Sequence, residues 1–437
     1  MYLGIALTAF VFAMLPICLA RPWIGMLTFA WLGYMNPHRL TWHFAYEMHY
    51  AIMVAVATLV GLLFTKDRKP MPWVRETYLL SALWGLFTLS TVFALYPSEA
   101  WKRWYFISKI LLFTYVPLLL LQDRKRLKWF LLIIALSIGF YGLKGGIWSI
   151  GKGGTGTVEM PDETMFSGTN GAALALNMVL PMLFYLAREE ETWWLRRLLR
   201  VTFVFSIVAV LFTYSRGGLL GLCAVLLVLA AKSGKLLRAT VALAAAYVLV
   251  MNFAPPQWFE RMGTIQTYEE DTSAQARLDA WYMSYRLALD RPLLGGGLES
   301  IGQPEIVARY LPGREGRGFG VAAHSVYFSL MGEHGFLGLG LFLALVASSV
   351  LTLRSLRRSR TRPSWVRSYS HMLEASFVGY LVTGAFLSVA YVDLFYHVIT
   401  CVILLKVLAD REPLEATAGK AGATVVKANH VRYSRVR

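Results

Sequence analysis

Charged residues are scarce in this sequence. They make up 16% of it, against 57% hydrophobic residues, and the mean hydropathy is +0.51. These values exclude an ordinary soluble domain and predict a membrane protein with several spans. The net charge of +17 could indicate a nucleic-acid partner. The basic residues, however, form short clusters between apolar runs, such as Arg124–Arg126 and Arg354–Arg367. This pattern is typical of cytoplasmic loops, so we expect these clusters inside the cell and no nucleic acid.

Several common chemical motifs are missing. The three cysteines, Cys18, Cys223 and Cys401, all lie in apolar runs, which argues against a disulfide framework or a cysteine metal site. Gly151-Lys-Gly-Gly154 lacks the spacing of a nucleotide-binding phosphate loop. The first residues, Met-Tyr-Leu-Gly, lack a basic segment, so we do not expect a cleaved signal peptide. Because a cysteine metal site and a nucleotide-binding loop are both missing, we predict no cofactor.

The apolar runs predict an all-α polytopic protein with about 12 or 13 crossings, at about 20 residues for each span. The ambiguity lies in residues 1–36, where Arg21-Pro22 divides the apolar sequence into one or two spans. We predict N-terminal transmembrane helices over residues 1–251, a periplasmic loop domain over 252–323 and C-terminal transmembrane helices over 324–410. Residues 411–437 should form a basic, disordered cytoplasmic tail.

The longest polar stretch runs from Asn252 to Gly335, between the apolar runs Leu236–Met251 and Phe336–Leu351. It contains seven arginines and no lysine. Loops of this length between spans are usually functional. We expect it to contain helices, and a glycine-rich turn at Pro292–Gly297 where backbone can approach a ligand. With the basic clusters inside, this loop, Arg216 and Asp393 all lie on the outer face.

Two arginines are candidates for binding an anion. Arg216 lies in Tyr-Ser-Arg-Gly-Gly at the tip of a predicted helical hairpin, and Arg277 shares a helix face with Trp281 at spacing i,i+4. Arginine presents a planar, permanently charged fork that matches phosphate oxygens. The alternatives are an interfacial arginine that reaches toward water and a solvated loop helix. Both interpretations fit the sequence alone.

His324 stands where the long loop re-enters the membrane. A histidine there could be a general base, because its ordinary pKa of about 6.5 suits proton abstraction at neutral pH. It could also be a helix cap or an interface residue. His334 lies almost three helical turns further on, so we leave it out of the mechanism. No Asp-x-Asp pair lies on the outer face, which disfavours a metal-dependent transferase and predicts no metal site.

Four segments together resemble the bacterial O-antigen ligase and polymerase family. They are Thr213–Gly218, the Arg277-x-x-x-Trp281 helix, Pro292–Gly297 and the stretch from His324 to Gly335. In the last segment Ser325, Tyr327, Glu333 and Gly335 fit the family pattern, and His334 falls at a variable position. The resemblance covers most of the chain from about Asn170 to Asp393. Phe166-Ser-Gly-Thr-Asn170 also looks like a variant associated with exosortase gene clusters.

This resemblance implies an inverting glycosyltransferase of the GT-C type in the bacterial inner membrane, with its active site facing the periplasm. The donor would be a glycan on undecaprenyl diphosphate, and the acceptor a hydroxyl of lipid A-core. The polymerase branch and the protein O-oligosaccharyltransferase branch remain alternatives. By the matching motifs, Arg216 and Arg277 would bind the donor diphosphate and His324 would act on the acceptor hydroxyl. Asp393, Trp281 and Tyr327 would be supporting positions.

Two function classes other than a transferase remain open. A transporter for lipid-linked glycans would more often place ionisable groups at mid-membrane or show two repeated halves. Here the distinctive charges gather toward one face and no internal repeat is visible. A receptor that uses the long loop as a binding module is the third option.

Overall fold

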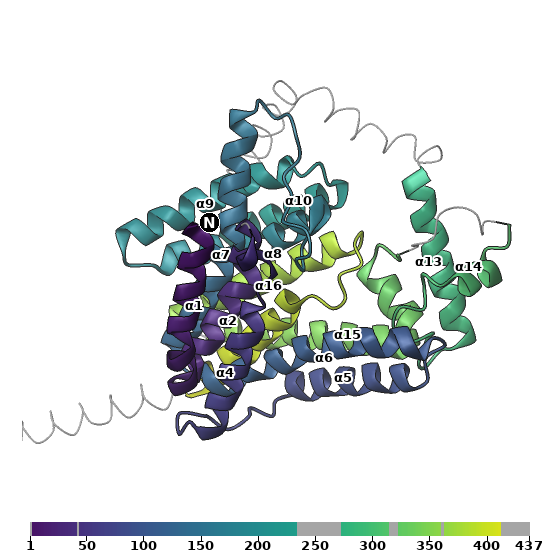
Figure 1. The fold of residues 1–437 in the computed structure, drawn as a ribbon, viewed down its shortest axis with the longest axis horizontal. Helices are drawn as coiled ribbons and strands as arrows, with labels where there is room; N and C mark the ends of the chain where they lie inside the picture. The colour runs from purple at the N-terminus through teal and green to yellow at the C-terminus, as the bar shows by residue number, and fades with distance from the viewer. Residues whose placement is uncertain (1, 42, 234–271, 314–321, 360–361, 412–437) are drawn as a thin grey trace, which may run out of the picture.

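The computed structural model describes residues 2–41, 43–233, 272–313, 322–359 and 362–411, and they are almost entirely helical (Figure 1). No β-strand occurs in these ranges, where Met160 and Gly168 form one isolated bridge. The all-α prediction is therefore confirmed for the described chain. The helices are α1 (Tyr2–Ala20), α2 (Pro22–Met35), η1 (Pro37–Leu40), α3 (Phe44–Glu47), α4 (Tyr50–Phe64), α5 (Arg75–Val92), α6 (Pro97–Leu120), α7 (Arg124–Gly151), α8 (Gly168–Glu189), α9 (Trp193–Leu211), α10 (Arg216–Ser233), α13 (Thr272–Asp290), α14 (Pro304–Tyr310), α15 (Val326–Arg358) and α16 (Ser364–Gly384).

A further helix covers residues 393–411. The predicted span Leu236–Met251, the first part of the long loop and the basic tail after residue 411 lie outside the described residues.

Five described helices are long and apolar enough to cross a membrane: α1, α6, α7, α8 and α15. This supports a multi-pass membrane protein, while the total of about 12 spans stays a prediction. The first 36 residues form two separate helices, α1 and α2, which break at Arg21 directly before Pro22. Proline favours a helix start at that point, because its missing N–H is not needed in the first turn.

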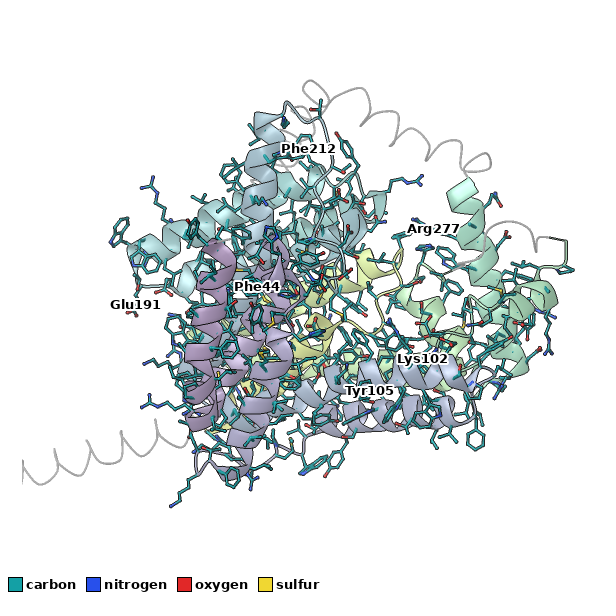
Figure 2. All side chains as sticks on the ribbon, in the orientation of Figure 1. Phe44, Lys102, Tyr105, Glu191, Phe212 and Arg277 are labelled. Carbon is teal, nitrogen blue, oxygen red and sulfur yellow. The ribbon has the colours of Figure 1, made fainter. Side chains whose placement is uncertain are left out.

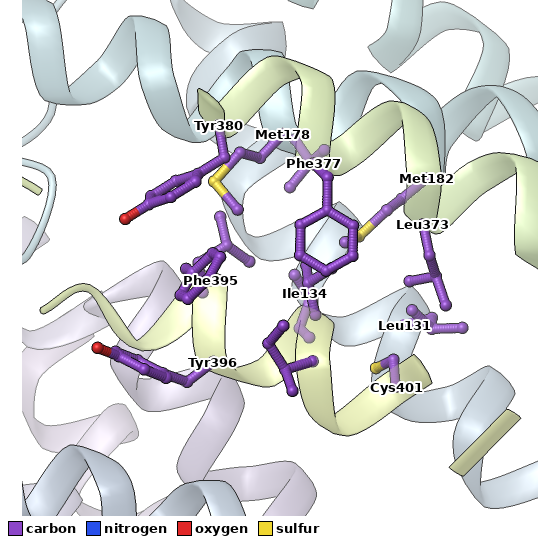
Figure 3. Packing of buried hydrophobic residues seen from close by; sticks show 14 of the residues in the cluster. Leu131, Ile134, Met178, Met182, Leu373, Phe377, Tyr380, Phe395, Tyr396 and Cys401 are labelled. Atoms are coloured by element: carbon purple, nitrogen blue, oxygen red, sulfur yellow. The ribbon is translucent and has the colours of Figure 1, made fainter. Parts of the chain in front are cut away.

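The core lies where α7, α8, α16 and the last helix meet. Figure 3 shows Ile134, Met178, Phe377 and Phe395 packed there, all of them less than 2% exposed. A buried amide fastens three helices within this packing. Asn177 Nδ2 on α8 donates to Gly218 O on α10 at 2.8 Å and to Thr383 Oγ1 on α16 at 3.0 Å. The start of α10 is therefore held in a fixed position relative to two core helices.

Helix α15 begins earlier than the sequence pattern predicted. The span was expected from Phe336, but the helix starts at Val326 and bends at Gly335, where φ is +66°. A Cβ at Gly335 would meet Pro292 O at 2.4 Å, so glycine allows the turn after α13 to pack against the bend.

The glycine-rich turn Pro292–Gly297 was expected to face a ligand, and that expectation is wrong. Its backbone instead pairs with α15: Gly296 N and Gly297 N donate to Gly332 O and Glu333 O, each at 2.9 Å. A Cβ at Gly295 would meet Gly332 O at 2.5 Å. The glycines therefore permit close approach to the protein's own backbone.

The described part of the long loop has a small core of its own. Met283 and Leu287 on α13 pack with Ile301, Ile306 on α14 and Ala323. In Figure 1, α13 and α14 lie at the opposite side of the molecule from α1. The loop thus supplies a folded element beside the ends of the core helices.

Candidate functional site

The turn before α10 is fixed by hydrogen bonds from its own side chains. Ser215 caps the helix, because its Oγ accepts a hydrogen bond from Gly218 N at 3.0 Å. Tyr214 adopts a left-handed φ of +54°, and its hydroxyl donates to Gly154 O at 2.6 Å. Arg216 is the first residue of the helix that follows. Its side chain therefore starts at the positive end of the helix dipole.

Asn170 joins this turn to α8. Ser215 Oγ donates to Asn170 Oδ1 at 2.6 Å. Close helix packing brings the two segments together, since a Cβ at Gly218 would meet Ala173 Cβ at 2.5 Å. Gly218 is thus required for the packing of α10 on α8. The asparagine amide is fixed in orientation by the same serine that caps α10.

Arg277 reaches the site from α13, and Figure 2 labels it on that helix. One turn later, Trp281 anchors α13 to the segment that carries His324. Its Nε1 donates to Ala323 O at 2.8 Å, and its ring stacks on Phe328 with centroids 4.9 Å apart. The two residues of the predicted i,i+4 pair therefore have different roles. Trp281 packs against the segment that carries His324, and Arg277 lines the cavity described below.

His324 has an unusual backbone conformation. Its φ is +44°, which costs a residue other than glycine on the order of 1–3 kcal/mol. Its backbone N–H donates to Ser388 Oγ at 2.8 Å. Two effects lower the pKa of the His324 imidazole below its ordinary value. Partial burial is the larger effect, and the positive charge of the neighbouring Arg277 is the smaller one. This shift favours the neutral imidazole, which is the form that can accept a proton.

One cavity of about 300 Å³ brings the three predicted residues together. Arg216, Arg277 and His324 all line it, although they come from three segments far apart in the chain. Asn170, Tyr214, Ser215, Gly217, Thr383, Phe386 and Leu387 complete the described lining. No carboxylate is among these residues. Two guanidinium groups and a helix N-terminus thus face one small space, an arrangement that favours an anion with several oxygens.

The supporting positions lie outside this cavity. Tyr327 OH donates to Leu381 O at 2.9 Å, which fixes the start of α15 against α16. Asp393 is partly buried at the start of the last helix, and its buried Oδ1 has no hydrogen-bond partner among the described residues. Trp281 contacts Ala323 and Phe328, on either side of His324 in the chain, and does not line the cavity itself.

His334 is also remote from the cavity. Its ring is fully buried, bonds to Ser90 Oγ at 2.6 Å and Tyr391 OH at 2.7 Å, and stacks on Phe87. It is a packed core residue, so its removal should affect stability. Among the described residues, no group of three or more histidine, cysteine, aspartate or glutamate side chains is placed to hold a metal ion.

Sequence reasoning missed Asn170, Thr383 and Phe386 as site residues. Asn170 belongs to Phe166–Asn170, a segment noted only for its resemblance to a family variant. Thr383 lies in the last turn of α16 and Phe386 just after that helix, where no motif marks them. Only packing reveals them, because they reach the cavity through contacts with α8 and α10.

Two family models match the chain. Residues 201–343 match the model described as O-Antigen ligase, and this range contains Arg216, Arg277 and His324. Residues 2–191 match a model described as a family of unknown function (DUF5935). No curated protein matches the chain. The predicted resemblance is confirmed for residues 201–343.

Proposed function

We propose that this chain, whose residues 201–343 match the O-Antigen ligase model, moves a glycan from undecaprenyl diphosphate to an acceptor hydroxyl, most readily that of lipid A-core. The match supports a membrane glycosyltransferase of the O-antigen ligase or polymerase type that uses lipid-linked glycans. The observation that carries the finer proposal is the shared cavity, which two arginines and a histidine line together. The reaction would take place on the periplasmic face of the inner membrane.

The proposed chemistry is one in-line displacement without a metal ion. The acceptor oxygen forms a bond to the anomeric carbon while the bond from that carbon to the diphosphate oxygen breaks. The hydroxyl proton goes to His324, and the bonding electrons leave with the diphosphate. Arg216, Arg277 and the start of α10 stabilise that growing negative charge in place of a metal cation. A single displacement inverts the anomeric configuration.

The acceptor could instead be another lipid-linked glycan or a protein hydroxyl, since the cavity contacts explain the donor end of the reaction. A transporter would need the same diphosphate contacts but no base. The presence of His324 in the same cavity as the two arginines, where it could serve as the base, therefore favours the transferase.

Transfer by the purified full-length protein tests this proposal. We expect product from an undecaprenyl-diphosphate glycan and lipid A-core, also in excess EDTA. Arg277→Lys keeps the charge but loses the two-pronged geometry, so activity should fall at least roughly 100-fold, about 2.7 kcal/mol in transition-state stabilisation. Arg216→Ala should lose at least as much.

The matched control is Arg309→Lys on α14, which lies outside the cavity and is 64% exposed. It should transfer at the wild-type rate. Near wild-type transfer by both cavity variants would contradict the proposal and leave the two arginines as interfacial residues.

A further inference from the structure

A second cavity lies against the loop between α7 and α8. Its volume is about 410 Å³, and it opens between the end of α7 and residues 157–162. All of its lining residues belong to the N-terminal part of the chain, the part that matches the family of unknown function. Nothing in the proposed transfer step uses it.

The loop between α7 and α8 connects the two cavities physically. Val158 N donates to Phe212 O at 2.8 Å, just before the Arg216 turn, and Tyr214 OH donates to Gly154 O. The same loop ends at α8, whose residue Asn170 lines the first cavity. Arg39 in η1 also holds this loop, through an ion pair with Glu163 at 2.7 Å. The second cavity is therefore held beside the first by direct contacts.

The lining combines an aromatic platform with groups that hydrogen-bond. Trp148 is 41% exposed. Its indole ring packs against Gly156, where an added Cβ would meet Trp148 Cη2 at 2.5 Å. Around it stand Lys144, Glu159 and Asp162, all exposed and none in an ion pair with another described residue. An indole face packs well against the apolar C–H face of a sugar ring, and charged side chains bind hydroxyls strongly.

We infer that this second cavity binds a sugar residue of a glycan whose reacting end occupies the first cavity. The inference rests on the proposed function. A lipid phosphate fits less well, because two carboxylates and one lysine give the lining a net negative charge. The bound sugar belongs either to the donor glycan, beyond its first residue, or to the acceptor glycan.

Binding to two synthetic donors tests the donor arm. One polyprenyl diphosphate carries a single N-acetylglucosamine, and the other carries a trisaccharide that begins with the same residue. The wild-type full chain in nanodiscs should bind the trisaccharide lipid roughly tenfold more tightly, which Trp148→Ala should reduce to under about twofold. Binding of the single-sugar lipid should stay unchanged and show that the variant is folded. Trp148→Phe should keep part of the advantage.

Trp193→Ala is the matched control, since Trp193 is 71% exposed at the start of α9 and lines neither cavity. For the acceptor arm, Trp148→Ala should raise the KM for an oligosaccharide acceptor roughly tenfold at unchanged kcat. An effect in either arm supports the inference and identifies the source of the sugar. No effect in both arms overturns it, as would an equal loss of affinity for vesicles of anionic phospholipid without glycan.

The two proposals fail in different ways. If Arg277→Lys leaves the binding of both lipids and the transfer rate unchanged, the proposed function is wrong. If Arg277→Lys weakens both lipids equally and Trp148→Ala changes nothing, only the second cavity has been misassigned.

Discussion

His324 combines three features that are each uncommon for a histidine at a membrane edge. Its backbone is left-handed, its N–H is fixed by Ser388, and its imidazole lies in a cavity with two arginines. Backbone strain of this kind persists only where surrounding contacts enforce it, and it often marks a functional position. The hydrogen bond that His324 N–H donates to Ser388 Oγ and the bond that Trp281 Nε1 donates to Ala323 O supply that enforcement.

Replacement of His324 by alanine should remove the base and leave the donor site intact. We expect kcat to fall about 10²- to 10⁴-fold, with the Kd for the lipid-linked donor within about twofold because the arginines hold the diphosphate. Steady-state kinetics and donor binding in nanodiscs measure the two quantities. His43→Ala is a suitable control, since His43 is exposed, also has a positive φ of 63° and lies outside the cavity.

Appreciable turnover by His324→Ala would remove the base assignment. Loss of donor binding would make His324 a third phosphate contact.

The pH dependence of transfer should follow the same imidazole. Only the neutral ring accepts a proton, so activity is present above the pKa of His324 and falls as the pH drops through it. Burial and the charge of Arg277 lower that pKa, so the acid limb of kcat/KM should lie below the ordinary value of about 6.5. In Arg277→Gln, which lacks the neighbouring charge, the limb of the residual activity should move upward. An acid limb above 6.5 in the wild type would contradict this assignment.

At the scale of elements, α15 depends on the bend at Gly335. The bend lets Phe336 N donate to Pro292 O at 2.8 Å, and the turn after α13 then bonds to Gly332 and Glu333 on the preceding helical segment. Because α13 carries Arg277 and the start of α15 follows His324, the bend sets the distance between the two. The glycine is therefore a structural requirement of the site, although it lies outside the cavity.

Gly335→Ala should destabilise the protein and reduce transfer. The new Cβ would meet Pro292 O at 2.4 Å in a backbone with φ of +66°, so we expect a loss of at least about 2 kcal/mol in stability. The apparent Tm in nanodiscs should drop by several degrees. Gly340→Ala in the same helix is the control, because no atom lies within 4 Å of its added Cβ. Equal Tm values for the two variants would show that the bend is not needed.

Local pattern explains why several elements could be predicted and others could not. The break at Arg21-Pro22 and the hairpin around Arg216 follow from proline and glycine, whose backbone preferences act locally. The start of α15 could not be predicted, because Val326–Gly335 reads as a polar junction and becomes helical through packing on α13 and α5. The turn Pro292–Gly297 was misread for a related reason: glycine indicates close approach, but the sequence does not say to what.

The cavity as a whole shows the same division. Arg216, Arg277 and His324 were predictable because each lies in a family motif, and residue type alone suggests their chemistry. Asn170, Thr383 and Phe386 contribute through tertiary packing of α8, α10 and α16, which no local pattern encodes. The second cavity likewise depends on a loop whose position is set by bonds to Phe212 and Tyr214.

Across the whole molecule, charge placement predicts the orientation in the membrane. Basic clusters such as Arg196–Arg200 and Arg354–Arg358 should face the cytoplasm, and α13, α14 and both cavities the periplasm. This orientation would give the proposed donor cavity access to a lipid-linked glycan in the outer leaflet. It also places Glu374, a buried carboxylate midway along α16, in a cluster with Lys232, Arg354 and Arg357, which lie near the cytoplasmic ends of α10 and α15.

Labelling with a membrane-impermeant maleimide tests that orientation. In a Cys223→Ser background, which removes the exposed native thiol, Ala308→Cys on α14 should react in intact spheroplasts. Arg197→Cys on α9 should react only after the membrane is permeabilised, because both positions are exposed on the protein and differ only in the side they face. Cys18 and Cys401 are buried and should stay silent. Reaction of Arg197→Cys but not of Ala308→Cys in intact spheroplasts would invert the topology. Both cavities would then face the cytoplasm, where a periplasmic acceptor could not reach His324.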